Sequence, residues 1–552
     1  MFQKYQKTLF FLIFLCLANI GFGQDKYREV QKNLQNFYEV YKQVNANYVD
    51  EIDTGKFLKS GINGMLKTLD PYTVLFEKED TRELDILKYG KYTGIGVQVS
   101  MEDEVITVIS LIEDAPAHRK GIQIGDILLE INGVSMKNKT LKQGQKLLRV
   151  PLGSEISLKI KRFTEDESLD YVLKTEEITI HNVPYSGFVE EGIGYVKLTK
   201  FSRSSDYEVR EAILKLKEEG ELNGLILDLR GNPGGLLDVA VKILSCFLPP
   251  NELVVYTKPK SATGKRDYFT SGKPVFLDKP LAILVDEGSA SASEIVAGAI
   301  QDLDRGIVIG TTTYGKGLVQ SEISLKSGDV LKITTAKYYV PSGRCVQKID
   351  YSKNDIFEEG FKIKENNSFT TLNGRTVFGG QGVSPDVIFK EEKEPKLLSE
   401  LKRKGMYSKF ITKYLSENPE AKVLPESSFA EFVNFLEENS FNYTNRWEKN
   451  LDEILTEMNL PKMDSLNVSS KVQELKNVLA SLKQNEMELN KQKINDSLQI
   501  EFLGTTLNFA SKLEYSVKVD SEIKLAKKLL VNNSKYQEKL FTTAIIGEKE
   551  TH

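Results

Sequence analysis

The stretch Leu222-Asn-Gly-Leu-Ile-Leu-Asp-Leu-Arg-Gly-Asn-Pro-Gly-Gly235 decides the fold of this chain. Its apolar first half is typical of a buried strand, and its glycine-rich second half is typical of a tight turn. Residues 236–248 then have the apolar spacing of a helix, and residues 280–288 repeat the pattern of a buried strand entering a turn. A second helix is expected over residues 291–303, followed by an apolar strand at 306–310. This alternation predicts a layered α/β core.

Regions of different composition flank this core, which we expect to span residues 164–392. In residues 24–90 the apolar positions recur every three or four residues, which predicts helices. Residues 91–163 alternate short strands with turn signals and predict a small β-domain inserted before the core. Residues 393–552 are charged, periodic and poor in glycine and proline, so we expect a helical bundle packed on the core. The predicted fold class is therefore a multidomain α/β (α+β) protein with helical N- and C-terminal regions.

Composition narrows the functional classes. A net charge of −4 over 552 residues is close to neutral and argues against a nucleic-acid-binding surface. The chain has only three histidines and three cysteines, and they are scattered. We therefore predict no metal site, no cofactor and no disulfide framework, with Cys246 and Cys345 as free thiols.

The first 23 residues have the pattern of a secretory signal peptide. Lys4 and Lys7 precede an apolar run, and small residues at Gly21 and Gly23 favour cleavage before Gln24. The alternative is an uncleaved anchor, although the run is short for a membrane span of ~20 residues. We expect an exported, periplasmic protein, which would be membrane-associated if the signal is not cleaved.

The segment Leu281–Glu294 places three serines between a buried strand and a helix. The first N–H groups of a helix lack partners and can stabilise a developing negative charge. One of these serines could be a nucleophile, or it could simply cap the helix. If the glycine-rich turn Arg230–Gly235 lies beside this junction, its backbone N–H groups could complete an oxyanion hole.

A nucleophilic serine needs a base. His118 and His181 lie in or just after the predicted β-domain and His552 is the last residue, so no histidine lies in the α/β stretch that holds the serines. Lys316 is the remaining option, since it stands between two glycines after an apolar strand. To act as a base near neutral pH, a lysine must have its pKa lowered from ~10.4 by roughly three units, which burial can achieve. Gln320, four residues on, could orient the amine.

Residues 310–316 also match most of a phosphate-binding P-loop. The position after Lys316 is Gly317, so the hydroxyl that would hold Mg²⁺ is absent. The residues that follow, 318–325, predict a strand rather than a helix. A nucleotide site is therefore excluded.

These features together resemble the carboxyl-terminal processing (tail-specific) serine peptidases. The resemblance covers residues 30–390 and rests on several motifs in the same order: Leu69–Thr73, Leu227–Gly235, Gly288–Ile295, Tyr314–Gln320 and Gly379–Asp386. It implies that Ser291 is the nucleophile, that Lys316 is the base and that Gln320 orients the lysine. It also implies oxyanion donors at Ala292 and at either Gly234 or Gly235.

Residues 91–163 resemble a PDZ domain. The resemblance implies that Gly94, Ile95, Gly96 and Val97 form a loop that binds a terminal carboxylate, while the substrate tail adds as a strand. The expected partners are protein substrates with exposed apolar C-termini, together with an adaptor protein or a second copy of the chain. Neither nucleic acid nor nucleotide is expected.

The resulting functional hypothesis is an exported serine endopeptidase with a Ser–Lys dyad. The alternative is a catalytically inactive PDZ-bearing scaffold that binds protein tails, and the intact Ser291, Lys316 and Gln320 count against it. A small-ester hydrolase is less consistent with the sequence, because the Gly-x-Ser-x-Gly elbow is missing around Ser291.

Overall fold

The computed structural model describes most of the chain. The described residues are 27–78, 90–102, 104–163, 165–261, 264–351, 362–363, 367–389, 394–445, 448–450, 453, 468–507 and 509–541. The predicted signal peptide lies outside them. The chain forms two compact units, of which the first comprises residues 1–78, 320–334 and 351–361, and the second the remainder.

The first unit is helical at its start, as predicted. Residues 27–47 form one helix and α2 (Thr54–Lys67) forms a second. The ring of Tyr41 stacks on that of Phe57, and the side chain of Asp53 accepts a hydrogen bond from Lys56 N at the start of α2. The short strand β1 (Val74–Phe76) then pairs antiparallel with residues 330–332.

The second unit is built on a six-stranded sheet in the order β10-β11-β12-β15-β16-β23. Neighbouring strands from β11 to β23 are parallel, and only β10 is antiparallel to its neighbour. This is the predicted alternation of strands and helices. The strands are β10 (Tyr185–Glu190), β11 (Ile193–Lys197), β12 (Gly224–Asp228), β15 (Leu281–Val285), β16 (Ile307–Gly310) and β23 (Val387–Ile388).

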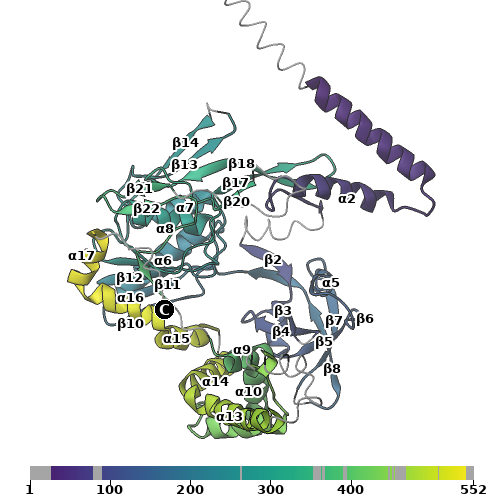
Figure 1. Cartoon of the computed structure of the whole chain (residues 1–552), viewed down its shortest axis with the longest axis vertical. Helices are drawn as coiled ribbons and strands as arrows, with labels where there is room; N and C mark the ends of the chain where they lie inside the picture. The colour runs from purple at the N-terminus through teal and green to yellow at the C-terminus, as the bar shows by residue number, and fades with distance from the viewer. Residues whose placement is uncertain are drawn as a thin grey trace, which may run out of the picture. The chain divides into compact units, whose positions relative to one another are not determined.

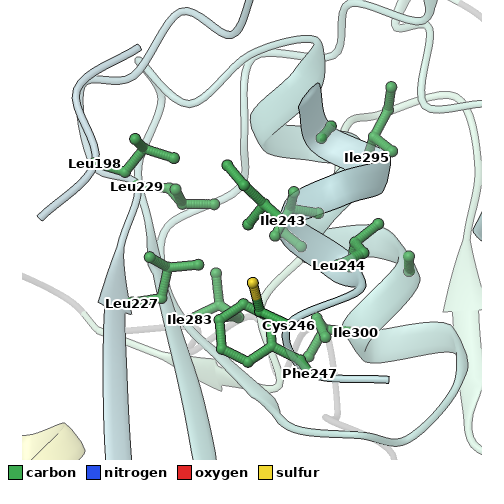
Figure 2. Packing of buried hydrophobic residues seen from close by; sticks show 14 of the residues in the cluster. Leu198, Leu227, Leu229, Ile243, Leu244, Cys246, Phe247, Ile283, Ile295 and Ile300 are labelled. Carbon is green, nitrogen blue, oxygen red and sulfur yellow. The ribbon is translucent and has the colours of Figure 1, made fainter. Parts of the chain in front are cut away.

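Helices cover both faces of this sheet. On one face lie α6 (Ser205–Glu219), α7 (Leu237–Leu244) and α8 (Ala292–Asp302). Figure 2 shows Leu227 and Ile283 of the sheet packing towards Ile243 of α7 and Ile300 of α8. Buried side chains of these helices and of the strands form one large apolar cluster on this face. This packing holds the strands, and therefore the turns that follow them, in place.

The other face is covered by the last helices of the chain, α15 (Phe509–Val519), α16 (Ser521–Val531) and α17 (Asn533–Phe541), drawn in yellow-green to yellow in Figure 1. Ile523 and Leu530 of α16 are buried against Ile226 and Leu284 of the sheet. The layered core is thus completed by residues that follow it by more than a hundred positions. The predicted packing of the C-terminal helices on the core is confirmed for these helices.

A second sheet flanks the core. Within the second unit, β13 (Leu253–Pro259) pairs antiparallel with β14 (Arg266–Phe269) and with residues 336–339 of β18 (Val330–Tyr339). The remaining short strands are β17 (Leu318–Ser324), β19 (Ile349–Asp350), β20 (Lys362–Ile363), β21 (Ser368–Thr370) and β22 (Thr376–Phe378).

The inserted β-domain has its own core and a six-stranded sheet in which β3, β4, β5, β7 and β8 lie in order and β6 pairs with β5. The sheet continues one strand past Phe163, since β8 pairs with β7 along its length from Lys174 to Ser168. Its elements are β2 (Lys91–Gly94), β3 (Val97–Glu102), β4 (Val105–Leu111), α4 (Pro116–Arg119), β5 (Ile127–Ile131), β6 (Val134–Ser135), α5 (Leu141–Leu147), β7 (Glu155–Lys161), β8 (Ser168–Lys174) and β9 (Glu176–Thr179).

The region after the core is helical, as predicted. An aromatic cluster that includes Phe410, Phe432 and Phe502 forms a separate small core. The helices of this region are α9 (Lys396–Arg403), α10 (Met406–Glu417), α11 (Ser428–Glu438), α13 (Val468–Leu489) and α14 (Lys491–Thr506). Within the described part of the chain, no helix combines the length and the apolarity needed to cross a bilayer.

A buried ion pair fixes the loop after β18. Arg344 and Asp302 are both fully buried, with Arg344 Nη2 2.7 Å from Asp302 Oδ1. Replacing Arg344→Met removes one partner and leaves the other charge uncompensated, so we expect a loss of roughly 3–5 kcal/mol in the free energy of unfolding. Chemical denaturation would measure it. Lys215→Met, which breaks an exposed pair with Glu219, is the control and should change stability by less than about 1 kcal/mol. Equal effects would contradict this account.

Candidate active site

The two turns singled out from the sequence lie at the same edge of the central sheet. β12 and β15 are parallel neighbours, with Leu225 opposite Leu281 and Asp228 opposite Leu284. The carboxyl ends of parallel strands meet at one edge, so the turn after β12 and the turn after β15 emerge together. The position of this edge is set by the buried strands rather than by the turns themselves.

Direct contacts hold the two turns together. Ala290 N and the Ser293 hydroxyl both donate to the carbonyl of Asn232, at 3.0 and 2.9 Å. Gly234 has φ +92°, and a Cβ atom built on it would lie 2.9 Å from Ser291 Cβ. Only glycine therefore fits at this point of closest approach. The condition for a shared oxyanion hole, that the turns lie side by side, is met.

The structure separates the three serines that the residue pattern left open. The hydroxyl of Ser289 donates to Leu229 O at 2.8 Å, the hydroxyl of Ser293 donates to Asn232 O, and both side chains are fully buried. Ser291 is only partly buried. Of the three, it is the one whose side chain is accessible without breaking such a hydrogen bond.

Ser291 also has an unusual backbone. It is the N-cap residue of α8, with φ +55° and ψ −110°. Positive φ is strained for a residue with a Cβ atom, and such strain persists only where surrounding contacts enforce it. Two contacts do so here: Ser291 N donates to Glu294 Oε2 at 2.8 Å, and the Tyr338 hydroxyl donates to Ser291 O at 3.1 Å.

Lys316 lies in the turn after β16, with its side chain partly buried. The flanking glycines allow a close approach of the segment that follows β18. A Cβ atom on Gly315 would lie 2.6 Å from Lys348 Cβ, and one on Gly317 would lie 2.9 Å from Cys345 Sγ. Lys348 N donates to Gly315 O at 3.0 Å. The glycines around Lys316 therefore let a second segment brace the turn.

The carboxylate of Glu294 joins the turn that carries Ser291 to the turn that carries Lys316. Its Oε2 accepts hydrogen bonds from Ser291 N and Lys316 N, both at 2.8 Å, and its Oε1 accepts from Gly315 N at 2.7 Å and from the Thr313 hydroxyl at 2.6 Å. Ser291 N and Lys316 N thus share one acceptor atom. Burial raises the pKa of the fully buried Glu294, and the four hydrogen bonds oppose that rise.

Sequence reasoning missed the role of Glu294. A glutamate three residues after a helix cap is ordinarily explained by capping its own helix. The contacts to Thr313, Gly315 and Lys316 come from a segment about twenty residues further along the chain. The sequence feature that could have indicated this role is that Glu294 is the one acidic residue among the small and apolar residues that begin the helix.

The three backbone N–H groups predicted as oxyanion donors differ in whether they already donate a hydrogen bond within the protein. Ala292 is the first residue of α8, where N–H groups lack partners inside the helix. Gly234 N already donates to Asn232 Oδ1 at 2.9 Å. Gly235 N donates to no acceptor in the described part of the chain, although its neighbours pair with Phe201. The structure thus distinguishes two glycines that the sequence left equivalent.

Gln320 belongs to the first unit. Its Nε2 donates to Thr334 Oγ1 at 3.2 Å, and Thr334 N donates to Thr73 Oγ1 at 3.2 Å. Thr73 is in turn held by the buried Asp70 through its N–H and its hydroxyl. The Leu69–Thr73 motif thus supports Thr334 of β18, the residue that accepts from Gln320, a connection that sequence reasoning did not make.

The predicted tail-binding residues line a groove of about 400 Å³ on the β-domain. Gly94, Ile95, Gly96 and Val97 form one side of it, and residues of α5 and its end, which the sequence analysis did not single out, form another. Gly96 has φ +80°, and a Cβ there would lie 2.1 Å from Ala115 Cβ. The other lining residues are Tyr92, Gln98, Val99, Ser110, Ile112, Gln145, Leu148, Arg149 and Ile180.

Cys246 and Cys345 are both free thiols, as predicted, and burial raises the pKa of the Cys246 thiol to about 11. The described residues contain no group of three or more histidine, cysteine or carboxylate side chains that could hold a metal ion.

The substitution Glu294→Gln tests whether this carboxylate joins the Ser291 and Lys316 turns. Glutamine keeps the shape of the side chain but places an NH₂ group at one of the two oxygen positions, so either Gly315 N or both Ser291 N and Lys316 N lose their acceptor. An unsatisfied buried N–H costs roughly 1–3 kcal/mol, and the thermal midpoint should fall accordingly. Calorimetry would measure the change. Glu287→Gln, an exposed residue in the same turn, is the control and should leave the midpoint unchanged. An unchanged midpoint for Glu294→Gln would contradict the assigned hydrogen bonds.

Comparison with protein-family models assigns four regions. Residues 192–356 match peptidase family S41, residues 107–162 match the PDZ domain, residues 397–530 match the C-terminal helical domain of probable PDZ-proteases, and residues 18–80 match the N-terminal domain of the activating protease CtpB. These regions follow the order of the domains described above.

Curated relatives agree. A carboxy-terminal-processing protease from Bartonella bacilliformis is 34% identical over 376 residues, which is 66% of this chain and 86% of the relative. A probable CtpA-like serine protease from Staphylococcus aureus is 35% identical over 318 residues, covering 57% of this chain and 63% of the relative. Among solved structures, a photosystem II D1 C-terminal processing protease matches at 23% identity with a TM-score of 0.35, over 66% of this chain and 94% of that one. The chain belongs to the carboxy-terminal-processing serine proteases of peptidase family S41 and carries a PDZ domain.

Proposed function

We propose that this protease uses a Ser–Lys dyad of Ser291 and Lys316 to hydrolyse peptide bonds in proteins whose C-terminal tails its PDZ domain binds. One observation carries the proposal: a single buried carboxylate oxygen accepts hydrogen bonds from the backbones of both Ser291 and Lys316. The turns that carry nucleophile and base are therefore held as one assembly. The family membership supports the serine-protease activity.

The chemistry follows from these positions. The neutral Lys316 amine takes the proton of the Ser291 hydroxyl while Oγ attacks the peptide carbonyl carbon. The oxyanion is stabilised by N–H groups of Ala292 and Gly235, because Gly234 N is already engaged with Asn232. The Lys316 ammonium then protonates the leaving amine as the C–N bond breaks. Lys316 finally accepts a proton from a water molecule that attacks the acyl carbon, and it returns this proton to Ser291 Oγ as the ester bond breaks, which restores the free enzyme.

Gln320 is assigned to orienting the Lys316 amine. The assignment rests on the Tyr314–Gln320 motif, and within the first unit the Gln320 Nε2 donates to Thr334 Oγ1. Substrate tails are assigned to the groove bounded by Gly94–Val97, where backbone N–H groups hold a terminal carboxylate. The groove's apolar lining, which includes Ile112 and Leu148, favours tails that end in apolar residues.

The central test compares the chain from Gln24 with its Ser291→Ala and Lys316→Ala variants on a loosely folded protein with an apolar C-terminus. Each variant should fold and bind the tail but lose about 10³-fold or more in turnover, because the nucleophile or its base is missing. Cleavage is followed by gel and mass spectrometry. Lys242→Ala, on an exposed face of α7, is the matched control and should retain wild-type turnover. Wild-type turnover in Ser291→Ala would overturn the dyad.

The same assay tests tail selection. Wild type should cleave the apolar-tailed protein faster than the same protein with a charged tail. Ile112→Asp places a negative charge in the groove and should abolish this preference without changing cleavage of the charged-tailed protein. Leu152→Asp, an exposed residue of the same domain that does not line the groove, should keep the preference. Tail binding without cleavage by any form, at every chain concentration, would favour the inactive-scaffold alternative.

We further propose that the chain is exported to the periplasm. The proposal is supported by the signal pattern of residues 1–23, with two lysines before a short apolar run. Expression of the full chain in a Gram-negative host, followed by fractionation and N-terminal sequencing, should give a periplasmic product that begins at Gln24. A cytoplasmic product that retains Met1 would contradict export, and an uncleaved membrane-bound product would identify an anchor.

A further inference from the structure

The C-terminal helix α16 contacts the glycine-rich turn through charged groups. Arg230, the first residue of that turn, directs Nη1 to Asp520 Oδ2 and to Glu522 Oε2, both at 2.9 Å. Asp520 is also the N-cap of α16, since its Oδ1 accepts from Glu522 N and Ile523 N. One carboxylate therefore connects the start of a helix to the start of the turn that carries Gly235.

The opposite side of the Arg230 side chain is fixed by the sheet. Its Nε and Nη2 donate to Asp228, whose Oδ1 also accepts from Arg230 N at 2.8 Å. Lys197 Nζ donates to Asp228 Oδ1 and to Arg230 O. Burial raises the pKa of Asp228, but the charges of Lys197 and Arg230 more than offset this and hold it at about 2. Arg230 is thus clamped between a strand end and α16.

These carboxylates are not needed to dock α16. Ile523, Ala526 and Leu530 are almost fully buried against the sheet and supply the apolar contact that holds the helix. Glu522 is 7% exposed, and its Oε1 has no hydrogen-bond partner in the described part of the chain. Burial raises the pKa of Glu522 to about 7, although Arg230 opposes the rise. Arg230 keeps Asp228 as an ion-pair partner when Asp520 and Glu522 are neutralised, so no buried charge is left unpaired.

We propose that Asp520 and Glu522 are positioning residues for the oxyanion hole: by binding Arg230 they hold the 230–235 turn, and with it the N–H of Gly235, against the Ser291 turn. The C-terminal helical region thereby completes the active site of the protease core. This inference rests on the proposed Ser–Lys mechanism, and it assigns to α16 a role that none of the sequence motifs indicated.

The turn can transmit such an effect because it is short and tightly connected. Arg230 lies five residues before Gly235, and between them Gly231 N donates to Asp286 Oδ1 and Asn232 O accepts from the Ser291 turn. A shift of Arg230 therefore strains the hydrogen bonds that hold the 230–235 turn against the Ser291 turn. Displacements of about 1 Å can cost a catalytic site on the order of 10²-fold in rate.

The test uses the full chain with the isosteric changes Asp520→Asn and Glu522→Gln, singly and together. Asparagine is a good N-cap residue, so α16 keeps its start. Assays are run at pH 8, above the raised pKa of Glu522. For the double variant we expect kcat to fall about tenfold or more, with KM changed less than about twofold, because the change acts on the transition state and not on tail binding.

The matched control is Glu190→Gln. Glu190 pairs with Lys527 at 2.6 Å and is another charged link between α16 and the sheet, but it does not contact Arg230. It should leave kcat unchanged. A fall in kcat with Glu190→Gln equal to that of the double variant would show that any loosening of α16 suffices and would overturn the positioning role. If the double variant does not fold, the Asp520→Asn single variant provides the same comparison.

The outcomes separate this inference from the proposed function. If wild type cleaves, Ser291→Ala does not, and the double variant keeps wild-type kcat, the positioning role is wrong while the dyad stands. If Ser291→Ala retains wild-type turnover, the dyad itself fails and the positioning role falls with it. A loss in kcat accompanied by a thermal midpoint within about 2 °C of wild type supports the inference, since global destabilisation would lower both.

Discussion

The active-site arrangement depends on one fully buried carboxylate. Glu294 binds the backbone N–H groups of Ser291, Gly315 and Lys316, and so connects the turns after two neighbouring strands. Backbone N–H groups that point at a common acceptor cannot move apart without losing it, and an unsatisfied buried N–H is costly. The positive φ of Ser291 is maintained by the same contact. The carboxylate thereby sets the separation of the Ser291 and Lys316 backbones.

The layered core provides the frame for that junction. Because β12, β15 and β16 are parallel neighbours, the turns that follow them emerge along one edge. Helices packed on both faces keep the strand ends in register. The last helices of the chain form one of these faces, so the C-terminal region contributes directly to the core of the protease.

Much of this could be predicted from the sequence. The buried strands at residues 222–229 and 281–285, each entering a glycine- or serine-rich turn, predicted the α/β core and the meeting of the two turns. The choice of Ser291 came from family resemblance, and the structure adds the reason that Ser289 and Ser293 have buried, hydrogen-bonded hydroxyls. Local sequence patterns were sufficient to predict these elements, because each strand and turn is specified by residues close in sequence. Parallel pairing of the strands then brings their turns to one edge.

The remaining features depend on distant contacts that leave no local pattern. Glu294 resembles an ordinary capping residue until the lysine turn folds onto it. The ion pairs of Arg230 with Asp520 and Glu522 span about 290 residues, and a charged helix normally indicates only a solvated face. The Gly235 N–H is available to bind an oxyanion and the Gly234 N–H is not, because the Asn232 side chain accepts a hydrogen bond from Gly234 N. Each of these features exists only in the folded chain, where distant segments meet.

The central claim is that Ser291 becomes acylated with Lys316 as its base. The most direct measurement is mass-spectrometric mapping of the acyl-enzyme, trapped by acid quench during turnover of an activated peptide ester. The account predicts acylation on Ser291 in the wild type and, within the same time, almost none in Lys316→Ala. Acylation of another residue, or equal acylation of Ser291 without Lys316, would contradict it.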